Sequence, residues 1–196
     1  MAGKEILIND LRPTQLMLGL EDVNRRAKIM RLLEPNELAR LIEKKSIPYV
    51  IGPQGGIYIV DHHHLCRALW SIGQKKAVLG KELADWSDLE IKEFWRRMDK
   101  NGYCWAIDSQ GHRRPYSAIP KHVCELTDNV WRSLARAIRG DAFTNEDTPF
   151  QECIWGDYFR TFMSQRLLEH DFELAKKIAT HIAHFKEAED LPGYKL

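Results

Sequence analysis

Net charge, cysteine and long apolar runs are all scarce in this sequence. The formal net charge is only +1, from 29 basic and 28 acidic side chains. The chain as a whole therefore has no general attraction to a polyanion, and a nucleic-acid contact would need a local basic surface. No apolar run approaches the roughly 20 residues that span a bilayer, and the apolar stretch near the N-terminus is too short for a secretory signal. We expect a soluble, cytoplasmic protein with no membrane partner.

The four cysteines are few and far apart, and none belongs to a Cys-x-x-Cys pair. In a chain without a secretory signal, this spacing predicts reduced thiols rather than a disulfide framework. We interpret Cys104, Cys124 and Cys153 as small buried apolar residues, and the fourth, Cys66, lies in the central motif described below.

Apolar periodicity predicts an α+β fold with a small mixed sheet and a mainly helical C-terminal part. A Gly-Pro-Gln-Gly-Gly turn between two apolar runs predicts a hairpin. We expect a core over residues 1–110 and a helical extension over 111–196 packed on it, with residues 140–149 as the clearest linker. Strands are expected at 5–8, 47–51, 57–60, 76–83 and 103–108, and helices at 20–33, 36–45, 62–72, 87–100, 130–138, 150–168 and 172–185.

One polar cluster stands out, Asp61-His62-His63-His64, where an apolar strand is expected to end and a helix to begin. The free N–H groups of a first helical turn attract phosphate, and Asp61 could cap the helix. In the simplest interpretation Asp61 is only a cap and the histidines lie on the surface. Three adjacent histidines favour a functional role instead.

An Asp-His-His sequence after an apolar strand first suggests the DHH phosphoesterases. Those enzymes hold two metal ions and need an Asp-x-Asp motif and further aspartates upstream. The only aspartates before Asp61 are Asp10 and Asp22. Too few carboxylates remain for a two-metal site, so this interpretation is rejected.

A second resemblance covers more of the chain, because five blocks occur in order along it. They are Pro13-Thr14-Gln15, residues 61–68, Phe94-Trp95, residues 120–126 and residues 132–135. In these blocks the chain resembles the ParB-like nuclease family of the ParB/sulfiredoxin superfamily, over residues 11–160. The resemblance implies a ParB/sulfiredoxin-like core whose strand-to-helix motif binds nucleotide phosphates.

The motif departs from the superfamily pattern at several positions. His62 stands where a glycine is usual and Leu65 where an arginine is usual, although Arg67 lies close enough to substitute. Gln15 stands where related kinases carry a glutamate base, and it cannot accept a proton. Cys66 is displaced from the position of the sulfiredoxin cysteine. Kinase and reductase chemistry are therefore disfavoured.

The resemblance and the residue types together predict a site for nucleotide or nucleic-acid phosphates, with nuclease or nucleotide-hydrolase activity. Asp61, His63 and His64 are the candidate catalytic residues, since histidine titrates near neutral pH. His62, Arg67, Gln15 and Arg12 are the candidate phosphate-binding residues. A divalent metal ion is the cofactor to consider, held by Asp61 and one or two of the three histidines, whose side chains diverge on a helix. The alternative is a non-catalytic module that binds a nucleotide or a protein.

Two other features have simpler explanations than a functional role. The basic segment 111–115, with Lys121 and His122, could contact a phosphate backbone, but a solvated loop is the simpler interpretation. Four aromatic residues recur at helical spacing, which indicates a hydrophobic core rather than platforms for bases; they are Trp131, Trp155, Tyr158 and Phe159.

Overall fold

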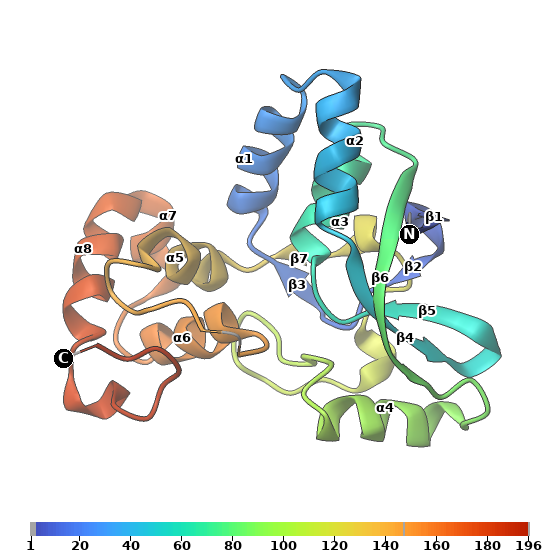
Figure 1. Ribbon diagram of the computed structural model, residues 1–196. Helices are drawn as coiled ribbons and strands as arrows, with labels where there is room; N and C mark the ends of the chain where they lie inside the picture. The colour runs from blue at the N-terminus through green and yellow to red at the C-terminus, as the bar shows by residue number, and fades with distance from the viewer. Residues whose placement is uncertain (1–2, 147, 196) are drawn as a thin grey trace. The chain divides into compact units, whose positions relative to one another are not determined.

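The expected hairpin forms the middle of a five-stranded mixed sheet (Figure 1). Strands β4 (Ile47–Gly52) and β5 (Gly56–Ile59) pair antiparallel, and the sheet order is β1-β6-β4-β5-β2. The β1–β6 pair is antiparallel, whereas β4–β6 and β2–β5 are parallel. The remaining strands are β1 (Lys4–Leu7), β2 (Leu11–Arg12) and β6 (Lys76–Asp85), with β3 (Met17–Leu18) and β7 (Thr127–Asp128) in a separate two-stranded sheet.

The computed structural model describes residues 3–146 and 148–195, and contacts divide the chain into two units after Thr127. The sequence predicted this boundary after residue 110. Residues 111–126 belong to the first unit because Ile119, Val123 and Leu126 are buried in its cores. Met1 and Ala2, the first residues of the N-terminal stretch that we expect not to be a secretory signal, lie outside the described residues.

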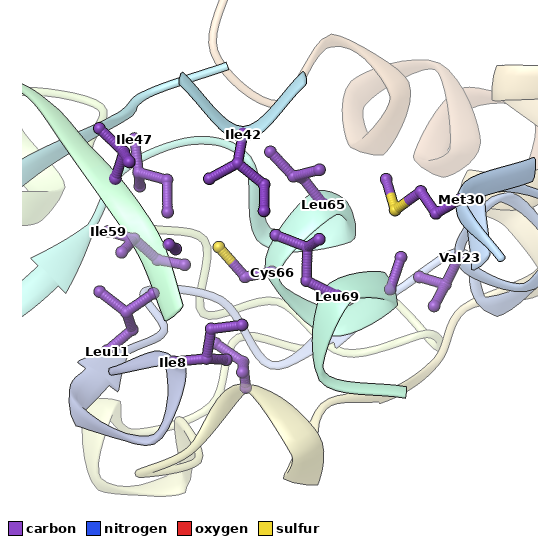
Figure 2. Packing of buried hydrophobic residues seen from close by; sticks show 14 of the residues in the cluster. Ile8, Leu11, Val23, Met30, Ile42, Ile47, Ile59, Leu65, Cys66 and Leu69 are labelled. Atoms are coloured by element: carbon purple, nitrogen blue, oxygen red, sulfur yellow. The ribbon is translucent and has the colours of Figure 1, made fainter. Parts of the chain in front are cut away.

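Both faces of the sheet in the first unit are covered, and the alternation of side chains along β5 shows how. Ile57 and Ile59 point into one core, whereas Tyr58 and Val60 point into the other. The first core is covered by α1 (Leu20–Met30), α2 (Pro35–Lys44) and α3 (His63–Ser71), and the second by α4 (Ile91–Lys100) (Figure 1). Figure 2 shows the first core, with Cys66 of α3 among its aliphatic side chains.

The second unit is helical among its described residues, with α5 (Val130–Ile138), α6 (Gln151–Arg160), α7 (Gln165–His170) and α8 (Phe172–Ile182). Trp155 is fully buried at its centre and stacks on Phe143, with ring centroids 4.4 Å apart. Trp131 and Phe159 are also buried, and Tyr158 packs against them. The prediction that these four aromatic residues form core is confirmed, as is the α+β class with a helical C-terminal part.

Short 3-10 helices complete the described structure at Ile8–Asp10, Pro53–Gly55, Tyr116–Ala118, Val123–Glu125 and Lys186–Ala188. Two expected helix starts are wrong. The helix expected from residue 36 begins at Pro35, because Glu34 and Glu37 form a capping box there. The helix expected from residue 87 begins only at Ile91, and the Ser87 N–H bonds the Asp85 carboxylate.

The strand expected at 103–108 is wrong. The backbone groups of this segment bond to separate partners: Trp105 N–H donates to the Thr14 carbonyl, and Asp108 N–H to the His112 carbonyl. Isolated bridges result instead of a ladder, and one of them joins Gln15 to Trp105.

The single helix expected at 150–168 is broken into α6 and α7. After α6 the Thr161 hydroxyl bonds the Tyr158 carbonyl, a local bond that competes with helix continuation. Residues 140–149 lie inside the second unit and link no domains; Ala142 and Phe143 are fully buried there. Residue 147 lies outside the described residues.

Candidate phosphate site at the start of α3

The Asp-His-His-His motif lies at a strand-to-helix junction, as predicted. β5 ends at Ile59 and α3 begins at His63, so Val60, Asp61 and His62 form the connection. His62 is the N-cap and has φ 65° and ψ 19°, the left-handed conformation that glycine adopts most easily. Histidine is among the few other residues enriched there. His62 therefore has a backbone conformation that is more usual for glycine.

Asp61 and His62 form a polar pair on the surface side of this junction. Asp61 Oδ1 accepts the His62 N–H at 2.5 Å, and Oδ2 lies 3.6 Å from His62 Nδ1. The Asp61 side chain is 74% exposed, and that of His62 is 28% exposed. Both side chains can reach a ligand from solvent.

His63 is buried and points at the Pro-Thr-Gln segment. Its Nε2 accepts the backbone N–H of Thr14 at 3.1 Å, and the Thr14 hydroxyl, 3.2 Å from the same nitrogen, donates to the Ile59 carbonyl. A nitrogen that accepts an N–H carries no proton, so the imidazole is neutral and protonated on Nδ1. His63 thus joins the start of α3 to the loop that follows β2.

His64 makes the equivalent bond five residues further along that loop. Its Nε2 accepts the backbone N–H of Gly19, the N-cap of α1, at 3.2 Å. His63 and His64 therefore hold the two ends of the segment from Thr14 to Gly19. Their Nε2 atoms are bonded to the protein's own backbone, which favours a positioning role over a catalytic one.

Gln15, Arg12 and Arg67, the other residues expected to bind phosphate, contact separate partners within the protein. Gln15 is 1% exposed, and its amide donates to the Met17 carbonyl at 2.9 Å. The exposed Arg12 donates to the Tyr58 hydroxyl at 3.2 Å. Arg67 lies over the Trp70 ring, 4.7 Å from its centroid. Each of these side chains is held by a neighbour in its own part of the first unit.

Two cations that the sequence analysis missed act on His62. Burial lowers the pKa of His62 below its usual 6.5, Asp61 opposes that effect, and the charges of Lys45 and Arg26 lower the pKa further. Arg26 also bonds the buried Asp22, Nε to Oδ2 at 2.6 Å. Lys45 caps the end of α2 and Arg26 lies within α1, so no motif links them to His62. Lys45 and Arg26 can be identified as neighbours of His62 only from the packing of the helices.

The cysteines are poorly suited to chemistry in this structure. Cys66 is fully buried, and burial strongly raises the pKa of its thiol; burial also raises the pKa of Cys104 to about 12 and that of Cys153 to about 11. Cys124 is half-buried. The expectation of buried thiols thus holds for Cys104 and Cys153. Across residues 3–146 and 148–195, no three His, Cys, Asp or Glu side chains are grouped so that they could hold a metal ion.

The basic segment 111–115 is exposed, and its two arginines have acidic partners. Arg113 bonds Asp99 at 2.5 Å and the Tyr116 hydroxyl at 2.9 Å, and Arg114 bonds Asp108 at 2.6 Å. These pairs offset the charge that a phosphate backbone would need. The geometry agrees with a solvated loop.

The fold and the junction define an α+β protein with a ParB-like strand-to-helix core. A family model described as "Putative ParB-like nuclease" matches residues 4–161, and the chain belongs to this family. The match extends beyond the first unit through α6.

A solved structure resembles the chain over nearly its whole length. It is protein Atu1540 from Agrobacterium tumefaciens, with a TM-score of 0.88 and 34% identity, and the match covers 98% of this chain and 97% of that one. A search of curated proteins found no significant match. No helix among the described residues is long and apolar enough to cross a membrane.

Proposed function

We propose that the start of α3 binds a phosphate group of a nucleotide or nucleic acid. The main support is the environment of His62. Its left-handed backbone precedes a helix, and the charges of Lys45 and Arg26 lower the pKa of its imidazole. The first N–H groups of a helix have no partner within the helix and attract anions. The positive end of the helix dipole adds to the same field. The family's description agrees with a phosphate-bearing ligand.

The histidines have different roles in this proposal. His62 faces the ligand and can donate to it, with Lys45 and Arg26 supplying charge from α2 and α1. His63 and His64 position the segment from Thr14 to Gly19 and do not contact the phosphate, because their Nε2 atoms accept backbone N–H groups.

Calorimetric titration with pyrophosphate and a mononucleotide tests the proposal. Lys45→Gln is expected to weaken binding about 3- to 10-fold, the effect of one nearby charge at a partly exposed site. Lys44→Gln is the matched control, because Lys44 is the exposed neighbouring lysine and is not among the charges that lower the pKa of His62. Its affinity is expected to stay within about twofold of wild type. The absence of pyrophosphate, nucleotide and oligonucleotide binding at millimolar concentration would refute the proposal.

A second candidate function, phosphodiester hydrolysis, is favoured by the Asp61–His62 pair. The lowered pKa of His62 keeps its imidazole neutral at pH 7, so it can accept a proton from an attacking water. The water oxygen would bond to phosphorus as the bond to the leaving oxygen breaks. Asp61, 3.6 Å from Nδ1, would stabilise the imidazolium or hold a divalent ion.

Turnover of a phosphodiester and of nucleotides, with Mg²⁺ or Mn²⁺ and without metal, separates the two functions. Under the hydrolysis hypothesis, His62→Asn abolishes turnover but leaves the fold intact, because asparagine tolerates the left-handed conformation. Binding without turnover in the wild-type protein would identify a non-catalytic module.

A further inference from the structure

Two segments of the first unit carry basic residues and no acidic ones, although the neighbouring Asp22 pairs with Arg25 and Arg26, and Glu5 pairs with Lys76. Residues 23–33 contain Arg25, Arg26, Lys28 and Arg31, and residues 62–81 contain Arg67, Lys75, Lys76 and Lys81. The near-neutral charge of the whole chain conceals this distribution. Before Asp128 there are 20 basic and 16 acidic residues, and from Asp128 onward 9 and 12. The first unit is therefore a better partner for a polyanion than the net charge suggests.

Helix packing brings the helical parts of these segments, in α1 and α3, together. Val23, Ala27 and Met30 of α1 share a core with Leu69 of α3 (Figure 2). At the far end of both helices, the Arg31 guanidinium donates to the Ser71 carbonyl at 3.3 Å. The ends of α1 and α3 thus form one surface, defined here as the Arg31–Arg67–Trp70 surface.

An exposed indole lies on this surface. Trp70 is 40% exposed and is the only large exposed aromatic side chain among the described residues of the first unit. The Arg67 guanidinium lies over its ring, and Arg67 Nε is buried without a hydrogen-bond partner. An aromatic face flanked by arginines is the combination that single-stranded nucleic acids contact, with a base on the ring and phosphates on the cations.

We propose that the Arg31–Arg67–Trp70 surface binds single-stranded nucleic acid, with one base stacked on Trp70 and the backbone along Arg31 and Arg67. A duplex keeps its bases stacked on one another, so the indole favours a single strand. The inference rests on the proposed function and names its ligand class, because the phosphate site and this surface lie at the two ends of α3. Trp70 lies eight residues beyond His62, about 12 Å along the helix, which one strand can span.

Fluorescence anisotropy with a labelled single strand of about 16 nucleotides, a typical site size, tests the inference. Trp70→Ala is expected to weaken binding about 5- to 100-fold, the usual range for loss of one stacked base. Trp70→Phe should retain most of the affinity. Phe162→Ala is the matched control, because Phe162 is 45% exposed and lies in the acidic second unit; it should stay within about twofold of wild type. Arg31→Gln should reduce the salt dependence of binding.

Failure of this inference is distinguishable from failure of the proposed phosphate site. If Trp70→Ala leaves single-strand affinity unchanged while Lys45→Gln weakens pyrophosphate binding, the surface inference is overturned and the phosphate site stands. If Trp70→Ala weakens single-strand binding and pyrophosphate does not bind at all, the surface stands and the site at His62 falls. Equal affinity for duplex and single strand, insensitive to Trp70, also overturns the inference.

Discussion

The two units of this protein differ in the contacts that their buried residues make and in their charge. In the first, polar groups are buried at the motif: His63 and Thr14 bond to each other inside the unit, and Asp22 is held by two arginines. In the second, the centre is a stack of aromatic rings around Trp155. The first unit also carries an excess of basic residues and the second an excess of acidic ones. The buried His63–Thr14 contact of the first unit lies at the candidate phosphate site, whereas in the second unit the buried Asn129 caps α5 and the buried Gln151 bonds backbone carbonyls beside the aromatic core.

The sharpest test of this contrast is Trp155→Ala. The indole is fully buried, stacks on Phe143, and donates from Nε1 to the Pro192 carbonyl at 2.8 Å. Its removal is expected to lower the free energy of unfolding by about 3–5 kcal/mol, the range for deleting a buried large aromatic. Urea denaturation measures the loss. Phe162→Ala, at an exposed position, is the control and should cost far less. A loss below about 1 kcal/mol for Trp155→Ala would contradict the assigned core.

In the first unit, His63→Ala should lower stability by about 2–3 kcal/mol, because it leaves the Thr14 N–H buried without its acceptor. His64→Ala removes a half-buried acceptor and should cost about 1 kcal/mol. Urea denaturation of both variants gives the comparison. Pyrophosphate affinity measured on the folded fraction should change little. Abolition of binding without loss of stability would instead assign His63 to the ligand.

Asp61→Asn tests the charge balance at the motif. Removing this carboxylate from beside His62 should strengthen pyrophosphate binding about fivefold, roughly 1 kcal/mol, because one repulsive charge is lost. Calorimetric titration measures the change. Asp190→Asn, an exposed acidic residue of the second unit, is the control and should have no effect. Weaker binding in Asp61→Asn would indicate that the carboxylate recruits a cation.

The smallest expected effect is on the pH dependence of stability. Because the pKa of His62 is below 6.5 in the folded state, the unfolded chain takes up this proton first as pH falls. The contribution of neutral His62 to the free energy of unfolding is thus fully present above pH 6.5. It is lost as the pH drops from there through the pKa of His62 in the folded state. Urea denaturation of wild type and His62→Asn at about pH 7.5 and pH 5 measures the difference. The variant should lose less stability on acidification, and identical losses would refute the assignment.

Local patterns in the sequence predicted much of this fold. The turn between β4 and β5 fixed the hairpin, and helical spacing placed α5 at its observed bounds. The errors fall where tertiary contacts decide. Residues 103–108 have strand-like composition, but their N–H groups bond to separate partners such as Thr14. The boundary between the units falls later in the chain than expected, because Val123 and Leu126 are buried with α3.

The candidate site shows the same division. The position of the motif at a strand-to-helix junction follows from residue pattern alone, since an apolar strand ended by Asp61 and a helical apolar spacing after it leave few alternatives. The direction of each side chain does not follow from the residue pattern. Gln15 is 1% exposed and bonded to Met17, whereas Lys45 and Arg26 act on His62 from other helices. Side-chain contacts between distant segments have no signature in a single sequence.

By itself, the sequence determined that an Asp-His-His-His block ends a strand and begins a helix in a ParB-like protein. The tertiary structure decided which histidine faces outward. His63 and His64 accept N–H groups from the segment between β2 and α1, and His62 adopts the left-handed conformation beside two cations. The reason is physical: strand and helix periods are local properties of the chain, but hydrogen-bond partners and electrostatic neighbours depend on how separate segments pack.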